Sequence, residues 1–165
     1  MKHFFEYNWQ IRDEIIELCK DLSHEDLFRK RQGGLGSIAE TFYHIIKVEH
    51  NWIRDLQAKS ILENVFHDFT SFNQIIELSR TLRPEIKEYV LKWHPDIENN
   101  ILNVKPGNGK QIHCTYGEAI RHIIAHEIHH VGQLSIWFRE MGLTPVNSNL
   151  IHRGLFINNH QYSSK

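Results

Sequence analysis

Apolar residues recur every three or four positions along four stretches of this chain, the spacing that places side chains on one face of a helix. In the first stretch Phe5, Trp9, Ile16 and Cys19 share such a face. The pattern predicts four helices, over about 4–21, 37–57, 71–93 and 115–142.

Helix ends carry their own signals. A Ser or Thr followed three residues later by an acidic residue is typical of a helix start, and Ser23–Asp26, Ser37–Glu40 and Thr115–Glu118 show this pattern next to predicted helices. The last two predict capping boxes, and the first predicts a short turn. Gly142, with Pro145 beyond it, predicts the end of the last helix. Pro84 lies inside the third helix and should kink or split it.

Two segments between the helices lack helical spacing. Residues 32–36 read Gln-Gly-Gly-Leu-Gly, without the Lys-Ser/Thr pair of a phosphate-binding loop, so we expect a connecting loop. Residues 101–104 and 111–114 flank the turn signal Pro106-Gly-Asn-Gly109, which predicts a small hairpin or two extended arms. The polar tail from residue 146 is expected to be irregular.

Histidines gather in the last predicted helix. The chain holds 13 His in 165 residues, so a nine-residue window should contain about 0.7, yet residues 122–130 contain four. On a helical wheel His126 and His130 fall beside the apolar stripe, whereas His122 and His129 face solvent. Imidazoles at i and i+4 lie close enough to share one ion, so this pair is a candidate metal site. The alternative is that both are ordinary polar-face histidines.

His44 borders the apolar stripe of the second helix in the same way. If the second and fourth helices pack side by side, His44 completes a three-histidine site with His126 and His130. Three neutral imidazoles with one open position suit Zn²⁺ or Ni²⁺. Taken alone, His44 fits a partly buried histidine bonded to backbone, but beside the pair we favour ligation.

Several other residues lie near this candidate site. Glu49 and Glu127 fall within apolar stripes, where an unpaired charge is costly. Each could orient a ligand histidine, and Glu127 could act as a general base; pairing with Arg or Lys, without a catalytic role, is the alternative. Gln133 and Trp137 lie on the flank that holds the histidine pair, Gln133 as a group that contacts a ligand or substrate and Trp137 as a pocket wall.

His126-Glu127-x-x-His130 also matches the zinc-protease pattern HExxH, but the wider context fails. The metzincin continuation needs Gly and His where this chain has Gln133 and Ile136. Glu140, the acidic residue that follows, lies on the same helix rather than on a separate one. Cys114 precedes His126 by 12 residues, which is too far along a helix axis for it to act at the metal. We expect Cys114 to be a small apolar residue in an extended segment.

Composition narrows the class of protein. With 19 Lys+Arg against 20 Asp+Glu, the charge gives no reason to expect nucleic-acid binding. No apolar run reaches membrane-spanning length, and Cys19 and Cys114 form no CxxC pair. We expect one domain over residues 1–165, in a reducing cytoplasmic setting, without nucleic-acid or membrane partners.

Several stretches together resemble the DinB/YfiT-like family of four-helix metal-binding proteins, the Bacillus DinB type. The stretches are Tyr7-Asn-Trp9, Ser37-Ile-x-Glu-Thr-x-x-His44-Ile-x-x-x-Glu49-x-x-Trp52, Thr115-x-x-Glu118, His122-x-x-x-His126-Glu-x-His-His130-x-Gly-Gln133-Leu and Gly142-Leu-Thr-Pro145. They cover most of the chain in the order of the family.

The resemblance implies an all-α, up-down-down-up four-helix bundle with one long crossover, commonly dimeric. It implies Zn²⁺ or Ni²⁺ ligands at His44, His126 and His130. Some relatives are transferases that use low-molecular-weight thiols such as bacillithiol, and others are described as metal-dependent hydrolases. We therefore expect a metal-dependent enzyme acting on a small molecule, most simply a thiol S-transferase, with Glu127 and Gln133 as its supporting or catalytic groups. The alternatives are a hydrolase and a non-catalytic metal-binding stress-response protein.

Overall fold

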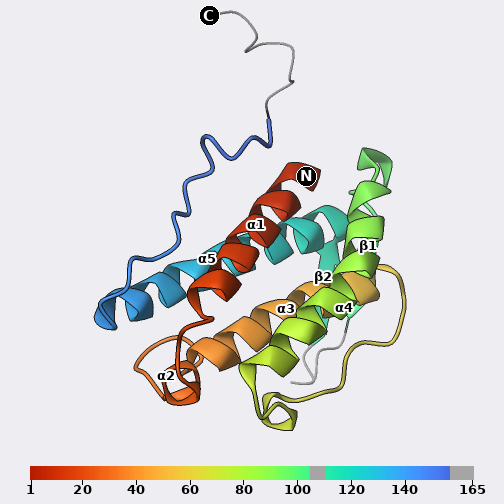
Figure 1. Ribbon diagram of the computed structural model, residues 1–165. Helices are drawn as coiled ribbons and strands as arrows, with labels where there is room; N and C mark the ends of the chain where they lie inside the picture. The colour runs from red at the N-terminus through yellow and green to blue at the C-terminus, as the bar shows by residue number, and fades with distance from the viewer. Residues whose placement is uncertain (105–110, 157–165) are drawn as a thin grey trace, which may run out of the picture.

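The computed structural model describes residues 1–104 and 111–156, and the described chain is mostly helical (Figure 1). It contains five α-helices: α1 (Lys2–Leu18), α2 (His24–Phe28), α3 (Ile38–Leu56), α4 (Phe72–Leu91) and α5 (Tyr116–Glu140). Short 3-10 turns, η1 (Phe66–Asp68) and η2 (Pro95–Ile97), lie in the connections before and after α4. The four long helices are the four that the apolar pattern predicts, with ends that differ by a few residues.

A small sheet joins α4 to α5, so the fold is mostly helical rather than all-α. Strands β1 (Ile101–Val104) and β2 (Ile112–Thr115) pair antiparallel, with Ile101 opposite Thr115 and Val104 opposite Ile112. The pairing confirms the hairpin interpretation of this segment. The turn signal at 106–109 lies outside the described residues.

The predicted caps are present at three helix starts. The Ser23, Ser37 and Thr115 side chains each accept a hydrogen bond from the backbone N–H three residues on. At Thr115 the Glu118 carboxylate completes a capping box. The predicted box at Ser37 is only half formed, because the Glu40 carboxylate pairs with Lys30 instead. An ion pair with a lysine on the preceding loop therefore replaces the second cap bond.

Helix α4 runs through Pro84 without a break, so the predicted split is wrong. Pro84 and Arg80 both lie on the exposed side of the helix. The backbone carbonyl of Arg80, which Pro84 leaves without its helical donor, can therefore bond to water. The apolar positions on the opposite face, such as Ile75, Ile86 and Val90, are buried and pack the helix against the rest of the bundle.

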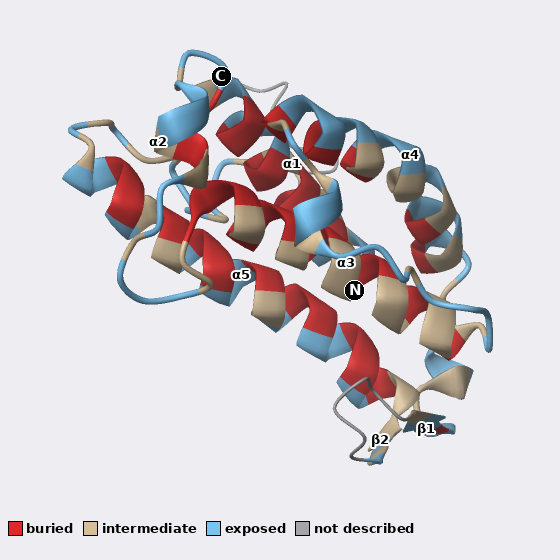
Figure 2. Cartoon of the chain, turned by 90° about the horizontal axis from the view of Figure 1, so that it is seen from below, coloured by how far each residue is buried: buried red, intermediate tan, exposed pale blue. Residues whose placement is uncertain are grey.

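The apolar faces of the long helices are buried against one another, and their side chains form two clusters in the interior (Figure 2). Helix α3 contacts both α4 and α5, and α1 contacts α4 and α5 from the other side. This arrangement places the second and fourth predicted helices side by side, which is the condition that the three-histidine site requires. No helix among the described residues is long and apolar enough to cross a membrane.

Candidate metal centre

Three imidazole rings from two helices converge on one point. His44 extends from α3, and His126 and His130 extend from successive turns of α5. The Nε2 atom of His126 lies 2.9 Å from Nε2 of His44 and 3.2 Å from Nε2 of His130. One ring nitrogen from each of the three residues lies within 4.8 Å of the others. The structure thus brings together the three residues that the sequence proposed as ligands.

The spacing of these nitrogens suits a single metal ion. Two nitrogens bound to one tetrahedral ion at about 2.0–2.1 Å lie about 3.3 Å apart. The two observed Nε2 separations, 2.9 and 3.2 Å, are close to that value. The third pair, His44 and His130, lies within 4.8 Å, so a small movement of the side chains would let all three rings ligate the same ion.

Gln133 determines which nitrogen of His130 carries the proton. Its amide nitrogen lies 3.0 Å from Nε2 of His129, and its Oε1 lies 2.8 Å from Nδ1 of His130. Since Oε1 can only accept, His130 must donate through Nδ1–H, which leaves a lone pair on Nε2. Gln133 therefore holds the ring in the tautomer that a metal ligand needs, the role that sequence analysis allowed for it.

No arrangement of ring protons satisfies both close contacts of His126. If its Nε2 carries a proton, that proton points at only one of the two neighbouring nitrogens. If its Nε2 is bare, it accepts from His44 but faces the bare Nε2 of His130 at 3.2 Å. A divalent cation resolves the conflict, because all three lone pairs then face positive charge. This chemistry of the donor set shows that the three residues fit a metal ion.

The electrostatic surroundings keep the rings neutral. Burial, followed by repulsion from the neighbouring His130, lowers the pKa of His44 to about 4. Burial, with the same neighbour next in importance, lowers the pKa of His126 to about 3, and burial also lowers the pKa of His130. All three are neutral at pH 7, so a cation need not displace a proton from them.

The other two histidines of the cluster lie outside the group. His122 and His129 are exposed, as the helical wheel predicts. The ring of His122 lies edge-on to Trp52, with centroids 5.4 Å apart. His129 contacts Gln133, so its part in the centre is to hold the amide that orients His130.

Glu49 and Glu127 both pair with a buried arginine that sequence analysis did not single out. Arg12 of α1 donates from Nε and Nη2 to the two carboxylate oxygens of Glu127, at 2.9 and 2.6 Å. Its Nη1 donates to Glu49 at 2.7 Å, and the indole N–H of Trp9 donates to the other Glu49 oxygen at 2.8 Å. Pairing with an arginine, the alternative that the sequence left open, is therefore what the structure contains.

The three charged groups of this cluster are almost fully buried, with side chains about 2% exposed. They tie α1 to both helices that carry the histidines. A sequence signal for Arg12 exists, since it lies three residues after Trp9 and four before Ile16, on the apolar face of α1. A charged residue at such a position needs buried partners of opposite charge, and Glu49 and Glu127 are those partners.

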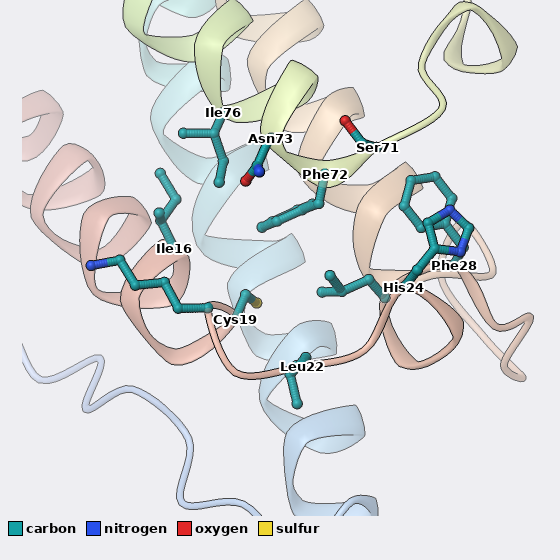
Figure 3. A pocket seen from close by; sticks show the side chains of 11 residues that line it. Ile16, Cys19, Leu22, His24, Phe28, Ser71, Phe72, Asn73 and Ile76 are labelled. Carbon is teal, nitrogen blue, oxygen red and sulfur yellow. The ribbon is translucent and has the colours of Figure 1, made fainter.

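The hollow drawn in Figure 3 lies apart from the three histidines. It has a volume of about 240 Å³ between the end of α1, α2 and the start of α4, and its walls include Ile16, Leu27 and Phe72. Cys19 also lines it, and burial raises the pKa of this thiol to about 12. The protonated Cys19 is a poor nucleophile, so we assign no chemistry to this hollow.

Comparison with known proteins identifies the family of this chain. The model of the DinB family matches residues 1–154. The chain belongs to the DinB family. It is 44% identical over 156 residues to the uncharacterized protein YizA of Bacillus subtilis (strain 168), covering 94% of this chain and 96% of that protein. The family resemblance drawn from the sequence is thus confirmed.

A solved structure supports the fold. The chain is similar to a DinB-like protein from Bacillus cereus ATCC 10987, with a TM-score of 0.67 and 19% sequence identity, covering 87% of this chain and 91% of that one. At this identity the likeness concerns the fold alone. Family membership together with the three converging histidines supports a site for a divalent metal ion.

Proposed function

We propose that this protein is a metal-dependent enzyme that transfers a low-molecular-weight thiol, of the bacillithiol type, to a small electrophilic molecule. The observation that carries the proposal is the convergence of three neutral Nε2 atoms from His44, His126 and His130. Zn²⁺ and Ni²⁺ are the ions that suit such a donor set.

Three neutral ligands leave the full positive charge of the ion, which would lower the pKa of a bound thiol and supply thiolate near neutral pH. The residues around the ion hold the ligands in place. Gln133 keeps His130 in the Nδ1–H tautomer. Arg12, through Glu49 and Glu127, holds the two ligand-bearing helices against α1.

Hydrolysis is the second candidate reaction, and it needs a base that takes a proton from water. Glu127 is the residue that sequence analysis proposed for this role. Both of its carboxylate oxygens accept hydrogen bonds from Arg12, and the side chain is about 2% exposed. A carboxylate held in this way is poorly placed to accept a proton from water, which favours thiol transfer over hydrolysis.

Metal binding is tested first, by elemental analysis of the purified protein and of single alanine variants. We expect about one divalent ion per chain, lost in His44→Ala, His126→Ala and His130→Ala. His122→Ala is the matched control from the same helix, and it should retain the ion because its side chain is exposed. His129→Ala should also retain the ion, because His129 is exposed and its loss removes only a contact to Gln133. Full occupancy after loss of His126 or His130 would contradict the site.

Activity is tested by supplying the Zn²⁺- or Ni²⁺-loaded protein with 1-chloro-2,4-dinitrobenzene and, in turn, cysteine, glutathione and bacillithiol. In the expected reaction the sulfur forms a bond to the ring carbon, chloride leaves with the bonding electrons, and the thiol proton goes to solvent. Thioether is measured by absorbance. Peptide and ester substrates are assayed in parallel.

The outcomes separate the three candidate functions. Thioether formation that requires both the ion and His126 supports the transferase. Ester or amide cleavage that requires Glu127 and no thiol assigns the protein as a hydrolase. Absence of turnover, together with a fourth protein ligand on the ion, favours a non-catalytic metal-binding protein.

We also propose that the four long helices follow the up-down-down-up order of the family bundle.

We further propose that the protein assembles as a homodimer. Ile128 and Ile136 of α5 are 43% and 56% exposed and lie two turns apart on the outer face of the helix, where a second chain could cover them. The family resemblance suggests that a second copy of the chain covers this face. Sedimentation should show a dimer that Ile136→Glu disrupts; a monomeric parent protein would contradict the proposal.

A further inference from the structure

The glycine-containing loop that precedes α3 packs against the metal centre. Its residue Gln32 accepts a hydrogen bond from the indole N–H of Trp137 at 3.2 Å, which fastens the loop to α5. Trp137 is buried, one turn beyond Gln133 on the same helix. From its sequence this segment is expected to be a connecting loop only.

Gly34 of this loop lies against the oxygen that orients His130. A Cβ atom at position 34 would lie 3.0 Å from Oε1 of Gln133 and 3.1 Å from Cη2 of Trp137. Both separations are shorter than ordinary van der Waals contact, so a side chain there would displace one of the two neighbours. Trp137 is packed in the core, and Gln133 is partly exposed and has more freedom to move.

Gln133 has little freedom to move without changing the centre. Its Oε1 accepts the Nδ1–H of His130 at 2.8 Å, while its amide nitrogen bonds to His129. Displacing Oε1 would remove the acceptor that fixes the His130 tautomer. The ring could then turn its Nε2 away from the other two ligands, or place a proton on it.

We propose that Gly34 is a positioning residue of the metal centre, which acts through Gln133 to hold the Nε2 lone pair of His130 toward the ion. This inference rests on the proposed metal site. It gives the loop at 32–36 a role in the site, in addition to connecting α2 to α3. The absence of a Cβ at Gly34 is what allows the loop to lie against the amide.

Gly33 provides a matched control. Both glycines have positive φ, 80° at Gly33 and 54° at Gly34, so alanine is strained in the backbone at either position. A Cβ at Gly33, however, would meet no atom within 4 Å. Gly33→Ala therefore reports the cost of the loop conformation, and Gly34→Ala reports that cost together with the contact to Gln133.

The experiment titrates the metal-free wild-type protein and both variants with Co²⁺ and records the visible d–d absorption. Loss of a residue that hydrogen-bonds to a metal ligand typically weakens metal affinity about 10–100-fold. We expect Gly34→Ala to raise the Kd for Co²⁺ about tenfold and to change the band shape. The Kd of Gly33→Ala for Co²⁺ should remain within about twofold of wild type, since this change leaves Gln133 in place behind His130. Circular dichroism at the titration temperature shows that each variant is folded.

A double-mutant cycle tests whether Gly34 acts through Gln133. Gln133→Ala removes the oxygen, so adding Gly34→Ala to that variant should cause no further loss of Co²⁺ affinity. Equal losses in both backgrounds would overturn the assignment. If Gly34→Ala does not fold, Trp137→Phe replaces it, because this variant frees the loop from α5 and should weaken Co²⁺ binding when Gln133 is present but not in Gln133→Ala.

Failure of this inference is distinct from failure of the metal site. If the wild-type protein binds no Co²⁺, Zn²⁺ or Ni²⁺, the proposed function is wrong. If the wild-type protein binds Co²⁺ and the two glycine variants have the same affinity and spectrum, the metal site stands and the role of Gly34 is overturned.

Discussion

Replacing Arg12 with methionine should cost this protein a large share of its stability. Methionine keeps most of the length of the side chain but removes the guanidinium that donates three hydrogen bonds to Glu49 and Glu127. Both carboxylates would stay in an interior where they are about 2% exposed. Glu49 would retain only its bond from Trp9.

The size of the loss follows from that arrangement. Removing one partner of a buried ion pair typically costs about 3–5 kcal/mol. We expect a loss in the upper part of this range, about 4–5 kcal/mol, because the change strands two carboxylates. Burial and then Glu49 raise the pKa of Glu127 while Arg12 lowers it, so without Arg12 this carboxyl takes up a proton more readily, which limits the cost.

The measurement is urea unfolding followed by circular dichroism, with the metal-free proteins compared at pH 7. In a thermal unfolding experiment a loss of about 4–5 kcal/mol would lower Tm by about 10–20 °C for a chain of this length. Arg83→Met is the matched control: Arg83 bonds to Asp13 at 2.6 and 2.7 Å, but Asp13 is 55% exposed. Breaking this surface pair should cost less than about 1 kcal/mol.

A triple variant separates the stranded charges from the lost packing. Arg12→Met combined with Glu49→Leu and Glu127→Leu removes all three charges, and such replacements are often neutral or stabilising. We expect its unfolding free energy to return to within about 1 kcal/mol of wild type. The reasoning is refuted if Arg12→Met alone costs less than about 1 kcal/mol, or no more than Arg83→Met.

Three further predictions follow from the structure. Chelation should lower Tm but leave the far-ultraviolet helical signal, because the bundle has an apolar interior independent of the ion; complete loss of helix would make the ion a structural element. At pH 8, Ellman's reagent should modify the half-buried Cys114 in the folded protein and Cys19 only after unfolding, because Cys19 is buried and burial raises its pKa to about 12; two equally reactive native thiols would contradict this. Gly142→Ala should cost about 1 kcal/mol in urea unfolding, since Gly142 ends α5 with φ 76°, and no loss would argue against this cap.

The sequence alone was sufficient for features that depend on local spacing. The four long helices follow from apolar residues repeating every three or four positions, and the starts at Ser23, Ser37 and Thr115 follow from short-range cap chemistry. The pairing of His126 with His130 belongs to the same class, because i and i+4 on a helix are neighbours whatever surrounds them. The helical wheel of the last helix also predicted that His122 and His129 are exposed.

Features that join distant parts of the chain were decided only by the packing of the helices. His44 reaches His126 across 82 residues of chain, and the sequence could place it in the site only if α3 and α5 lay side by side. Arg12 meets Glu127 across 115 residues, and the sequence showed that Glu127 needed a partner without showing which one. The position of Gly34 beside Gln133 depends on the path of a loop, and a loop has no periodic pattern from which this path could be predicted. The physical reason is common to all three: side-chain spacing defines a face of each helix, whereas the face against which it packs depends on the free energy of the whole interior.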